Sequence, residues 1–260
     1  MPTGDPTARF AELLAGPRES LPLDEAVLLV AAHDHEVDVP AQRARLDHLA
    51  ARCEAPTLEG VLAHLFGAEG FDGDVTDYHH PDNSFLDRVL DRRRGLPILL
   101  SILTAEVACR VGVCLATVGM PGHFLLRDCA DAEVFVDPFR SGQRIDRAEC
   151  ERLFRTLHPD TAFHESFLEP IDSHAVLSRV VANLARTFLE RGPASSAAWA
   201  LELRTLLAVD GDAAWRDLAR IRERLGDWGG AAEAWTRLAP TAADPAAVER
   251  RIAALRGRMN

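Results

Sequence analysis

Lysine is missing from this chain of 260 residues, because all 29 of its Lys+Arg residues are arginines. Mechanisms that require a lysine amine at a fixed position are therefore excluded. These are the phosphate loop of P-loop nucleotide-binding proteins, the β3 lysine of protein kinases, and Schiff-base or pyridoxal catalysis. Codon bias in a GC-rich genome is the simplest cause, since arginine can take most surface roles of lysine.

Cysteine and basic charge are also scarce. The five cysteines have no Cys-x-x-Cys spacing, which argues against a disulfide framework and a zinc site; they stand at positions 53, 109, 114, 129 and 150. With 40 acidic residues the formal charge is -11, which favours a protein partner or small ligand over nucleic acid or an anionic membrane. The start MPTGDPTARF lacks a signal-peptide pattern, and no apolar run reaches membrane-spanning length. We expect a soluble, cytoplasmic protein.

Apolar residues recur at three- and four-residue spacing from Leu23 to about Arg94, which predicts short helices. The segment of residues 70–84 interrupts this spacing with glycine, proline, Asp and Asn, so we expect a structured loop there. Ser84 is the expected N-cap of the following helix, which runs through Leu90.

The next segment, residues 97–110, has the clearest helical pattern. Pro97 suits the first position of a helix, and Gly112 stands just beyond the end. Apolar residues occur on almost every side, which is typical of a helix buried within a domain.

After this helix the helical spacing of apolar residues ends. Three short apolar segments follow, and they predict antiparallel strands. They are residues 114–119, 122–127 and 133–137. If residues 128–132 form the hairpin loop, Arg127 faces Glu133, and His123 faces Asp137. Directly opposed residues have Cβ atoms about 4.5 to 5.5 Å apart, which allows an imidazole and a carboxylate to hydrogen-bond. One bulge would break this register.

The chain is again helical in pattern from His174 onward, and here it repeats itself after 34 residues. The superposed pairs are Leu184 and Leu218, Ala185 and Ala219, Arg186 and Arg220, Gly192 and Gly226, Ala197 and Ala231, and Leu201 and Trp235. This is the tetratricopeptide period, so we expect helix-turn-helix units and a final helix over 245–256. The four tryptophans of this region, at positions 199, 215, 228 and 235, are expected to pack between helices.

Three motifs stand in fixed order along the chain, namely NSFLDRVLDRRRGLPILLSILTAEVACRVGV, VGMPGHFLLR and FVDPFRSGQ. Together with the repeat tail they resemble the bacterial SirB-type proteins, over nearly the whole chain. The resemblance implies an α+β fold in three parts. A helical N-terminal portion spans residues 1–94, a papain- or transglutaminase-like core with a small antiparallel sheet spans 95–172, and an all-α tetratricopeptide-like region spans 173–260.

In transglutaminase-like enzymes a nucleophilic cysteine opens the central helix, usually in a Gly-x-Cys pattern, and a histidine and an aspartate follow on adjacent strands. A helix N-terminus lowers the pKa of a thiol, the histidine takes its proton, and the aspartate orients the imidazole. The resemblance implies His123 of PGHF and Asp137 of VDPF in these two roles. Pro97 stands where the cysteine should be, a loss that the SirB-type branch commonly shows.

Other nucleophiles are poorly placed. Ser101 lies one turn, about 6 Å, beyond Pro97, and Cys109 lies about 18 Å from the helix start. Cys114 and Cys129 fall at strand or loop positions. We favour a buried or incidental role for the cysteines, and without a nucleophile we interpret His123 and Asp137 first as a structural pair and second as a remnant of an active site.

Candidate binding residues are Tyr78 and Asn83 in the loop, Arg94 at the helix end, and Ser101 on the central helix. The run Arg92-Arg93-Arg94 favours a solvated helix end whose cations meet carbonyl dipoles over a grip on phosphate.

No metal and no cofactor is predicted. His33 and His35, two positions apart on a helix, point in different directions, and His79 and His80 meet no ligand spacing.

Two functions remain open. The favoured one is a pseudoenzyme that acts as a regulatory scaffold and binds a protein or peptide partner through its C-terminal repeats. The alternative is an amide hydrolase or acyltransferase that uses His123 and Asp137 with a displaced thiol or hydroxyl.

Overall fold

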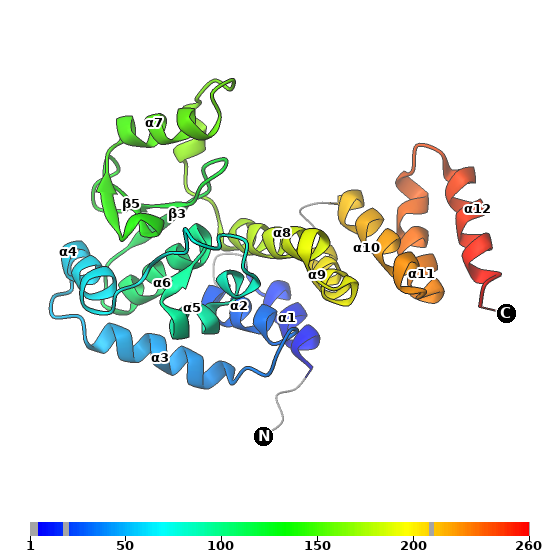
Figure 1. Cartoon of the computed structure of the whole chain (residues 1–260), viewed down its shortest axis with the longest axis horizontal. Coiled ribbons are helices and arrows are strands. Elements are labelled where there is room, and N and C mark those ends of the chain that lie inside the picture. The colour runs from blue at the N-terminus through cyan, green and yellow to red at the C-terminus, as the bar shows by residue number, and fades with distance from the viewer. Residues whose placement is uncertain (1–4, 18–20, 208–210, 260) are drawn as a thin grey trace. The chain divides into compact units, whose positions relative to one another are not determined.

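A computed structural model of the chain describes residues 5–17, 21–207 and 211–259 (Figure 1). The chain divides into two compact units, residues 1–180 and 181–260. The first unit combines helices with a small antiparallel sheet, and the second is helical. The α+β class expected from the sequence is confirmed.

Short helices form the first part of the first unit. They are α1 (Pro6–Ala15), α2 (Leu23–Ala31), α3 (Val39–Ala51) and α4 (Leu58–Leu62), the last continued by a π-helical segment (Ala63–Ala68). The apolar spacing from Leu23 onward predicted the later ones. Helix α1 lies before that pattern, and its signals are local: the side chain of Asp5 caps it and Pro6 stands at its first position.

The loop of residues 70–84 is ordered and ends in a 3-10 turn (Pro81–Ser84) before α5 (Leu86–Arg92). The prediction that Ser84 caps α5 is wrong. Phe85 is the N-cap and makes no side-chain hydrogen bond, while the Ser84 hydroxyl is buried without a partner. Ser84 is instead the last residue of the 3-10 turn, so the helix begins one position later than the sequence suggested.

Helix α6 (Pro97–Arg110) is the central element of the first unit. Pro97 opens it as predicted, and ten of its residues are buried: Pro97, Ile98, Leu99, Leu100, Ser101, Ile102, Leu103, Thr104, Val107 and Ala108. Gly112 follows with φ 84°, a left-handed conformation that favours glycine. The expectation of a buried helix is confirmed.

The main sheet has the order β3-β4-β5-β6, with all pairs antiparallel. Its strands are β3 (Leu115–Val118), β4 (Leu125–Asp128), β5 (Phe135–Asp137) and β6 (Gln143–Ile145). A second pairing, parallel and very short, joins β1 (Asp72–Gly73) to β2 (Arg94–Gly95). Strand β6 was not predicted, because its sequence Gln-Arg-Ile is mostly polar and only Ile145 is buried.

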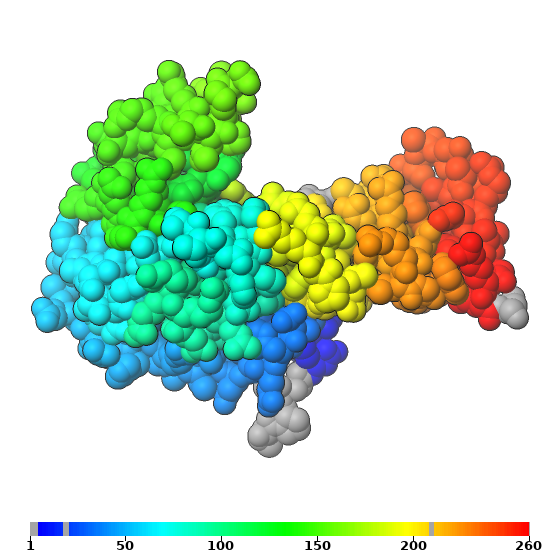
Figure 2. Space-filling view, in the orientation of Figure 1, coloured from blue at the N-terminus to red at the C-terminus, as the bar shows by residue number. Residues whose placement is uncertain are grey.

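The two faces of the main sheet are covered by different helices. On one face Val118, Leu125 and Phe135 pack with Cys150 and Phe154 of α7 (Arg147–Leu157). On the other face, residues of the sheet pack against α4 and α6; they are Leu126 and Val136 of the sheet, Leu58 and Leu62 of α4, and Ala105 of α6. Figure 1 shows α7 above the sheet and α6 below it, and Figure 2 shows sheet and α7 (green) as a lobe on the wider base of N-terminal helices.

The predicted register of the β4–β5 hairpin is wrong by two residues. Arg127 pairs with Phe135, where the sequence suggested Glu133. The turn is centred one residue later than expected, since the carbonyl oxygen of Asp131 accepts the N–H of Val134 and its carboxylate accepts the N–H of Glu133. A shift of two residues keeps each side chain on the same face of the sheet.

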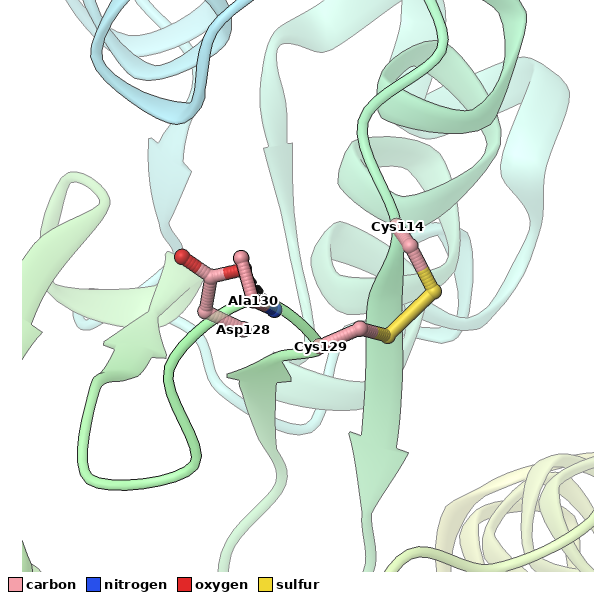
Figure 3. The surroundings of a disulfide bond; sticks show 4 residues. All are labelled: Cys114, Asp128, Cys129 and Ala130. Atoms are coloured by element: carbon pink, nitrogen blue, oxygen red, sulfur yellow. Dashed lines mark hydrogen bonds between the residues drawn. A yellow bond between two sulfur atoms is a disulfide. The ribbon is translucent and has the colours of Figure 1, made fainter.

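A disulfide joins Cys114 to Cys129 (Figure 3). The two residues extend the β3–β4 ladder by one pair, because Leu115 is opposite Asp128 and the N–H of Cys129 donates to the Cys114 carbonyl oxygen. Their Cα atoms are 5.5 Å apart, which is the distance of directly opposed residues. The sequence argued against a disulfide framework, and this single bond corrects that expectation, because it depends on strand pairing that cysteine spacing does not reveal.

The second unit consists of helical hairpins. Following the end of α8 (Ser173–Arg191), its helices are α9 (Ala194–Leu206), α10 (Gly211–Leu225), α11 (Trp228–Leu238) and α12 (Pro245–Arg256). Ala197 and Ala231, which the 34-residue shift superposes, are both fully buried, and Gly226 has φ 76° in the turn before α11. A helical C-terminal region is confirmed. Within the described ranges, no helix is long and apolar enough to cross a membrane.

Candidate functional site

The structure brings His123 and Asp137 together. His123 Nε2 lies 2.9 Å from Asp137 Oδ2, and the side chains are 9% and 0% exposed. His123 stands just before β4, and Asp137 ends β5. The second carboxylate oxygen of Asp137 accepts the N–H of Phe139 at 3.0 Å. Asp137 therefore holds the imidazole through Nε2, which leaves Nδ1 as the nitrogen that can meet another group.

Phe139 connects this pair to the loop of residues 70–84. Its ring lies edge-on to His123 at 6.2 Å and to Tyr78 at 5.7 Å between centroids. Residue 73 must be glycine here, because a Cβ at Gly73 would lie 2.4 Å from the carbonyl oxygen of Phe139. Tyr78, the chain's single tyrosine, is 38% exposed and is thus the accessible member of this aromatic group.

The start of α6 supplies no nucleophile. Pro97 is its first residue, and Ser101, one turn on, is 0% exposed with a hydroxyl that has no hydrogen-bond partner. The helix packs against the 3-10 turn Pro138–Arg140 that follows Asp137. Among the described residues, no hydroxyl or thiol is hydrogen-bonded to His123, whose side chain contacts Asp137 and the Phe139 ring.

The thiols are also unsuited to nucleophilic attack. Burial, together with the nearby carboxylates of Asp146 and Asp137, raises the pKa of Cys150 to about 12, and burial raises the pKa of Cys53. Cys109 is exposed near the far end of α6. A thiolate is the reactive form of cysteine, so none of these described thiols forms a site with His123.

Asn83 and Arg94 hold the loop in place. Asn83 is fully buried, donates to the carbonyl oxygen of Asp77 at 2.8 Å and accepts from Arg92 at 2.8 Å. Arg94 donates to the carbonyl oxygens of Gly70 and Arg93. Both candidate binding residues therefore form hydrogen bonds within the protein, and neither is hydrogen-bonded to the His123 side chain.

The three arginines of the run are exposed, as predicted for a solvated helix end, and Arg94 meets carbonyl oxygens, but the other two also form ion pairs that the sequence did not predict. Arg92 donates to Asp74 at 3.0 Å, and Arg93 donates to Glu69 at 2.6 Å. Burial opposes ionisation of Asp74, but hydrogen bonds from the Asp77 N–H, Thr76 and Arg92, among others, prevail and lower its pKa to about 2. Arg92 thus pairs with a carboxylate of the loop, and Arg93 pairs with Glu69 just before the loop, while both arginines stay exposed.

His33 and His35 have separate partners. His35 Nε2 donates to Asp87 Oδ2, 2.7 Å away, and His33 contacts Thr7 and the carbonyl oxygen of Leu29. Across the part of the chain that the structure describes, no group of three or more His, Cys, Asp or Glu residues is arranged to hold a metal ion.

Sequence reasoning missed Arg179. Its Nη2 donates to the carbonyl oxygen of His123 at 3.3 Å, although the two residues are 56 positions apart. The available signal was an arginine within the apolar run Val176–Val181 of α8, where neighbouring side chains are buried. The tertiary partner of such a residue cannot be read from the pattern.

Comparison with known proteins agrees with this architecture. Residues 31–182 match the transglutaminase-like superfamily. A UPF0162 protein of Xylella fastidiosa (strain 9a5c) is 31% identical over 236 residues, which cover 84% of this chain and 83% of that protein. The UPF0162 protein PA3419 of Pseudomonas aeruginosa is 30% identical over 191 residues, 69% of each chain.

A eukaryotic protein is similar to part of this chain. F-box only protein 21 of Mus musculus is 33% identical over 140 residues, which cover 50% of this chain and 22% of that protein. The match to the superfamily spans more than half of the chain, and it includes α6, the main sheet, His123 and Asp137. The chain belongs to the transglutaminase-like superfamily.

Proposed function

We propose that this protein is a non-catalytic member of the superfamily, of the SirB type, which acts as a regulatory scaffold for a protein or peptide partner. The observation that carries the proposal is the start of α6, where Pro97 occupies the position of the nucleophile and no described hydroxyl or thiol is bonded to His123. A histidine and a carboxylate without a nucleophile can orient or bind a ligand, but they cannot form the covalent intermediate of thiol catalysis.

The second unit offers a surface for the partner. We infer that its hairpins are tetratricopeptide-like, in keeping with the 34-residue repeat. A cavity of about 480 Å³ lies between α10, α11 and α12. Arg216, Arg220 and Trp235 line it, and the two arginines are exposed, one turn apart on α10. Arginine and tryptophan are the residue types that most often dominate binding at protein interfaces.

The scaffold is proposed to work in the cytoplasm. In that compartment thiols are kept reduced, so the Cys114–Cys129 pair is expected as two thiols in the cell.

Affinity capture from native cytosol tests the scaffold. The full chain serves as bait, beside Arg216→Glu/Arg220→Glu and the control Arg250→Glu, an exposed arginine on α12 outside the cavity. We expect a partner that the full chain and the control retain and that the double variant loses by about tenfold or more. His123→Ala should retain it as well. Equal capture by all variants would contradict a role for the repeat surface.

A further inference from the structure

One arginine beside His123 is cradled by the turn between β3 and β4. Arg179 Nη2 donates to the carbonyl oxygens of Met120 (3.2 Å) and His123 (3.3 Å). Its guanidinium carbon lies 5.2 Å from the centre of the Phe124 ring. A Cβ at Gly119 would lie 2.4 Å from Arg179 Nη1. The turn therefore accommodates the guanidinium in this position because residue 119 is glycine.

This guanidinium lacks the counterion that other partly buried arginines have. Arg110 binds three carboxylates, those of Asp24, Asp47 and Glu106. Among the described residues, Arg179 forms no ion pair, and its hydrogen bonds go to backbone oxygens. Burial lowers the pKa of Arg179, and the interaction with Tyr78 opposes this effect. A partly buried cation without a counterion is costly, so an anion at this place would stabilise it.

The remaining donors of Arg179 fit a planar anion. Both of its hydrogen bonds start from Nη2, so the N–H groups on Nε and Nη1 have no acceptor among the described residues. A guanidinium presents such groups as a flat fork that matches a carboxylate in two parallel hydrogen bonds. Asp137 does not fill this role, because among the described residues it forms no ion pair with Arg179, and its oxygens meet His123, Arg140 and the Phe139 N–H.

We propose that Arg179 anchors a binding site for a peptide carboxylate beside His123. The site rests on the peptide-binding role proposed above and gives that role a ligand chemistry. One guanidinium balances one negative charge, so the site suits a carboxylate better than a doubly charged phosphate. The site includes the partly exposed Tyr78, because its ring meets the same Phe139 ring as His123 does.

Peptide titrations followed by NMR test the site on the full-length, isotope-labelled chain. The probes are acetyl-Ala-Ala-Ala with a free carboxylate, acetyl-Ala-Glu-Ala-amide, the neutral acetyl-Ala-Ala-Ala-amide, and inorganic phosphate. We expect saturable shifts of the Gly119 and His123 amide resonances with at least one of the two carboxylate peptides, and the peptide that binds tells a terminal from a side-chain carboxylate. Shifts that are equal with the neutral amide, or absent with both carboxylates, would overturn the proposal.

Variants assign the binding to Arg179. Arg179→Gln should weaken carboxylate binding by about tenfold or more, whereas Arg152→Gln, a 66% exposed arginine on α7, should leave it unchanged. If Arg179→Gln does not fold, Arg179→Lys provides the comparison, since it keeps the charge and loses the fork. Unchanged binding in the folded variant, or phosphate binding tenfold tighter than both peptides, would overturn the assignment. The titration needs no cellular partner, so its failure would leave the capture result, and the scaffold, standing.

Discussion

His123 Nε2 lies 2.9 Å from Asp137 Oδ2, although the two residues are not directly opposed in the β4–β5 ladder. The ladder pairs Leu126 with Val136, so its continuation places Asp137 opposite Leu125, two residues after His123. Diagonal neighbours on one face are within reach of an aromatic side chain. The hydrogen bond therefore forms because the two side chains lie on the same face of the sheet and Asp137 is buried there.

Replacing Asp137 by alanine should destabilise the protein. The change leaves the Phe139 N–H and His123 Nε2 without their acceptor in a buried place. Hydrogen bonds to a charged group contribute about 1.5 to 3 kcal/mol each, so we expect the free energy of unfolding to fall by about 2 kcal/mol or more in urea denaturation. Asp160→Ala, at an exposed position, is the control. Equal stability of the two variants would show that the pair does not support the fold.

Reducing the Cys114–Cys129 bond should also lower stability. The bond closes a loop with a sequence separation of 15, for which chain entropy predicts about 3 kcal/mol as an upper range. Denaturation with and without dithiothreitol measures this difference. The double variant Cys114→Ser/Cys129→Ser should match the reduced protein and show no response to reductant. A response in that variant would assign the effect to another thiol.

The folded protein should protect Cys150 from alkylation. Its pKa is raised to about 12, mainly by burial, so hardly any thiolate exists at pH 8. Cys109 is exposed and should react first. Mass spectrometry after a short treatment with iodoacetamide compares the two sites. Labelling of Cys150 as fast as Cys109, without unfolding, would contradict its burial between α7 and the sheet.

We expect the protein to lose stability in acid because of Asp74. Its pKa is lowered in the folded state to about 2, below the unperturbed value of about 3.9. The stabilisation is therefore complete above about pH 4 and is lost as the pH falls toward 2. Unfolding measured across this window should be steeper for the natural protein than for Asp74→Asn. Identical slopes would mean that the hydrogen bonds from Thr76 and Arg92 do not favour the ionised carboxylate.

Local patterns predicted much of this fold. The burial of α6 follows from apolar residues on all its sides. Pro97 marks its start, and Gly112 lies just past its end. The face shared by His123 and Asp137 follows from the alternation of strands, which survives an error of two residues. These features depend on residues close together in the chain, so they can be predicted from the sequence.

Features that depend on distant partners could not be predicted in the same way. Arg92 forms an ion pair with Asp74, which lies 18 positions earlier in the loop of residues 70–84. Cys114 meets Cys129 only once β3 and β4 have paired. Arg179 reaches the His123 carbonyl from a helix 56 residues later. Each contact is set by tertiary packing, on which spacing along the chain carries no information.

The most direct test of the central claim is His123-dependent turnover. The purified full chain and folded His123→Ala are incubated with pooled amide substrates and amine acceptors, and hydrolysis and transamidation products are quantified by mass spectrometry. A protein with Pro97 at the nucleophile position is predicted to give no product above the His123→Ala background. Product that the full chain forms and the folded His123→Ala variant does not would contradict the account and show an enzyme with a displaced nucleophile.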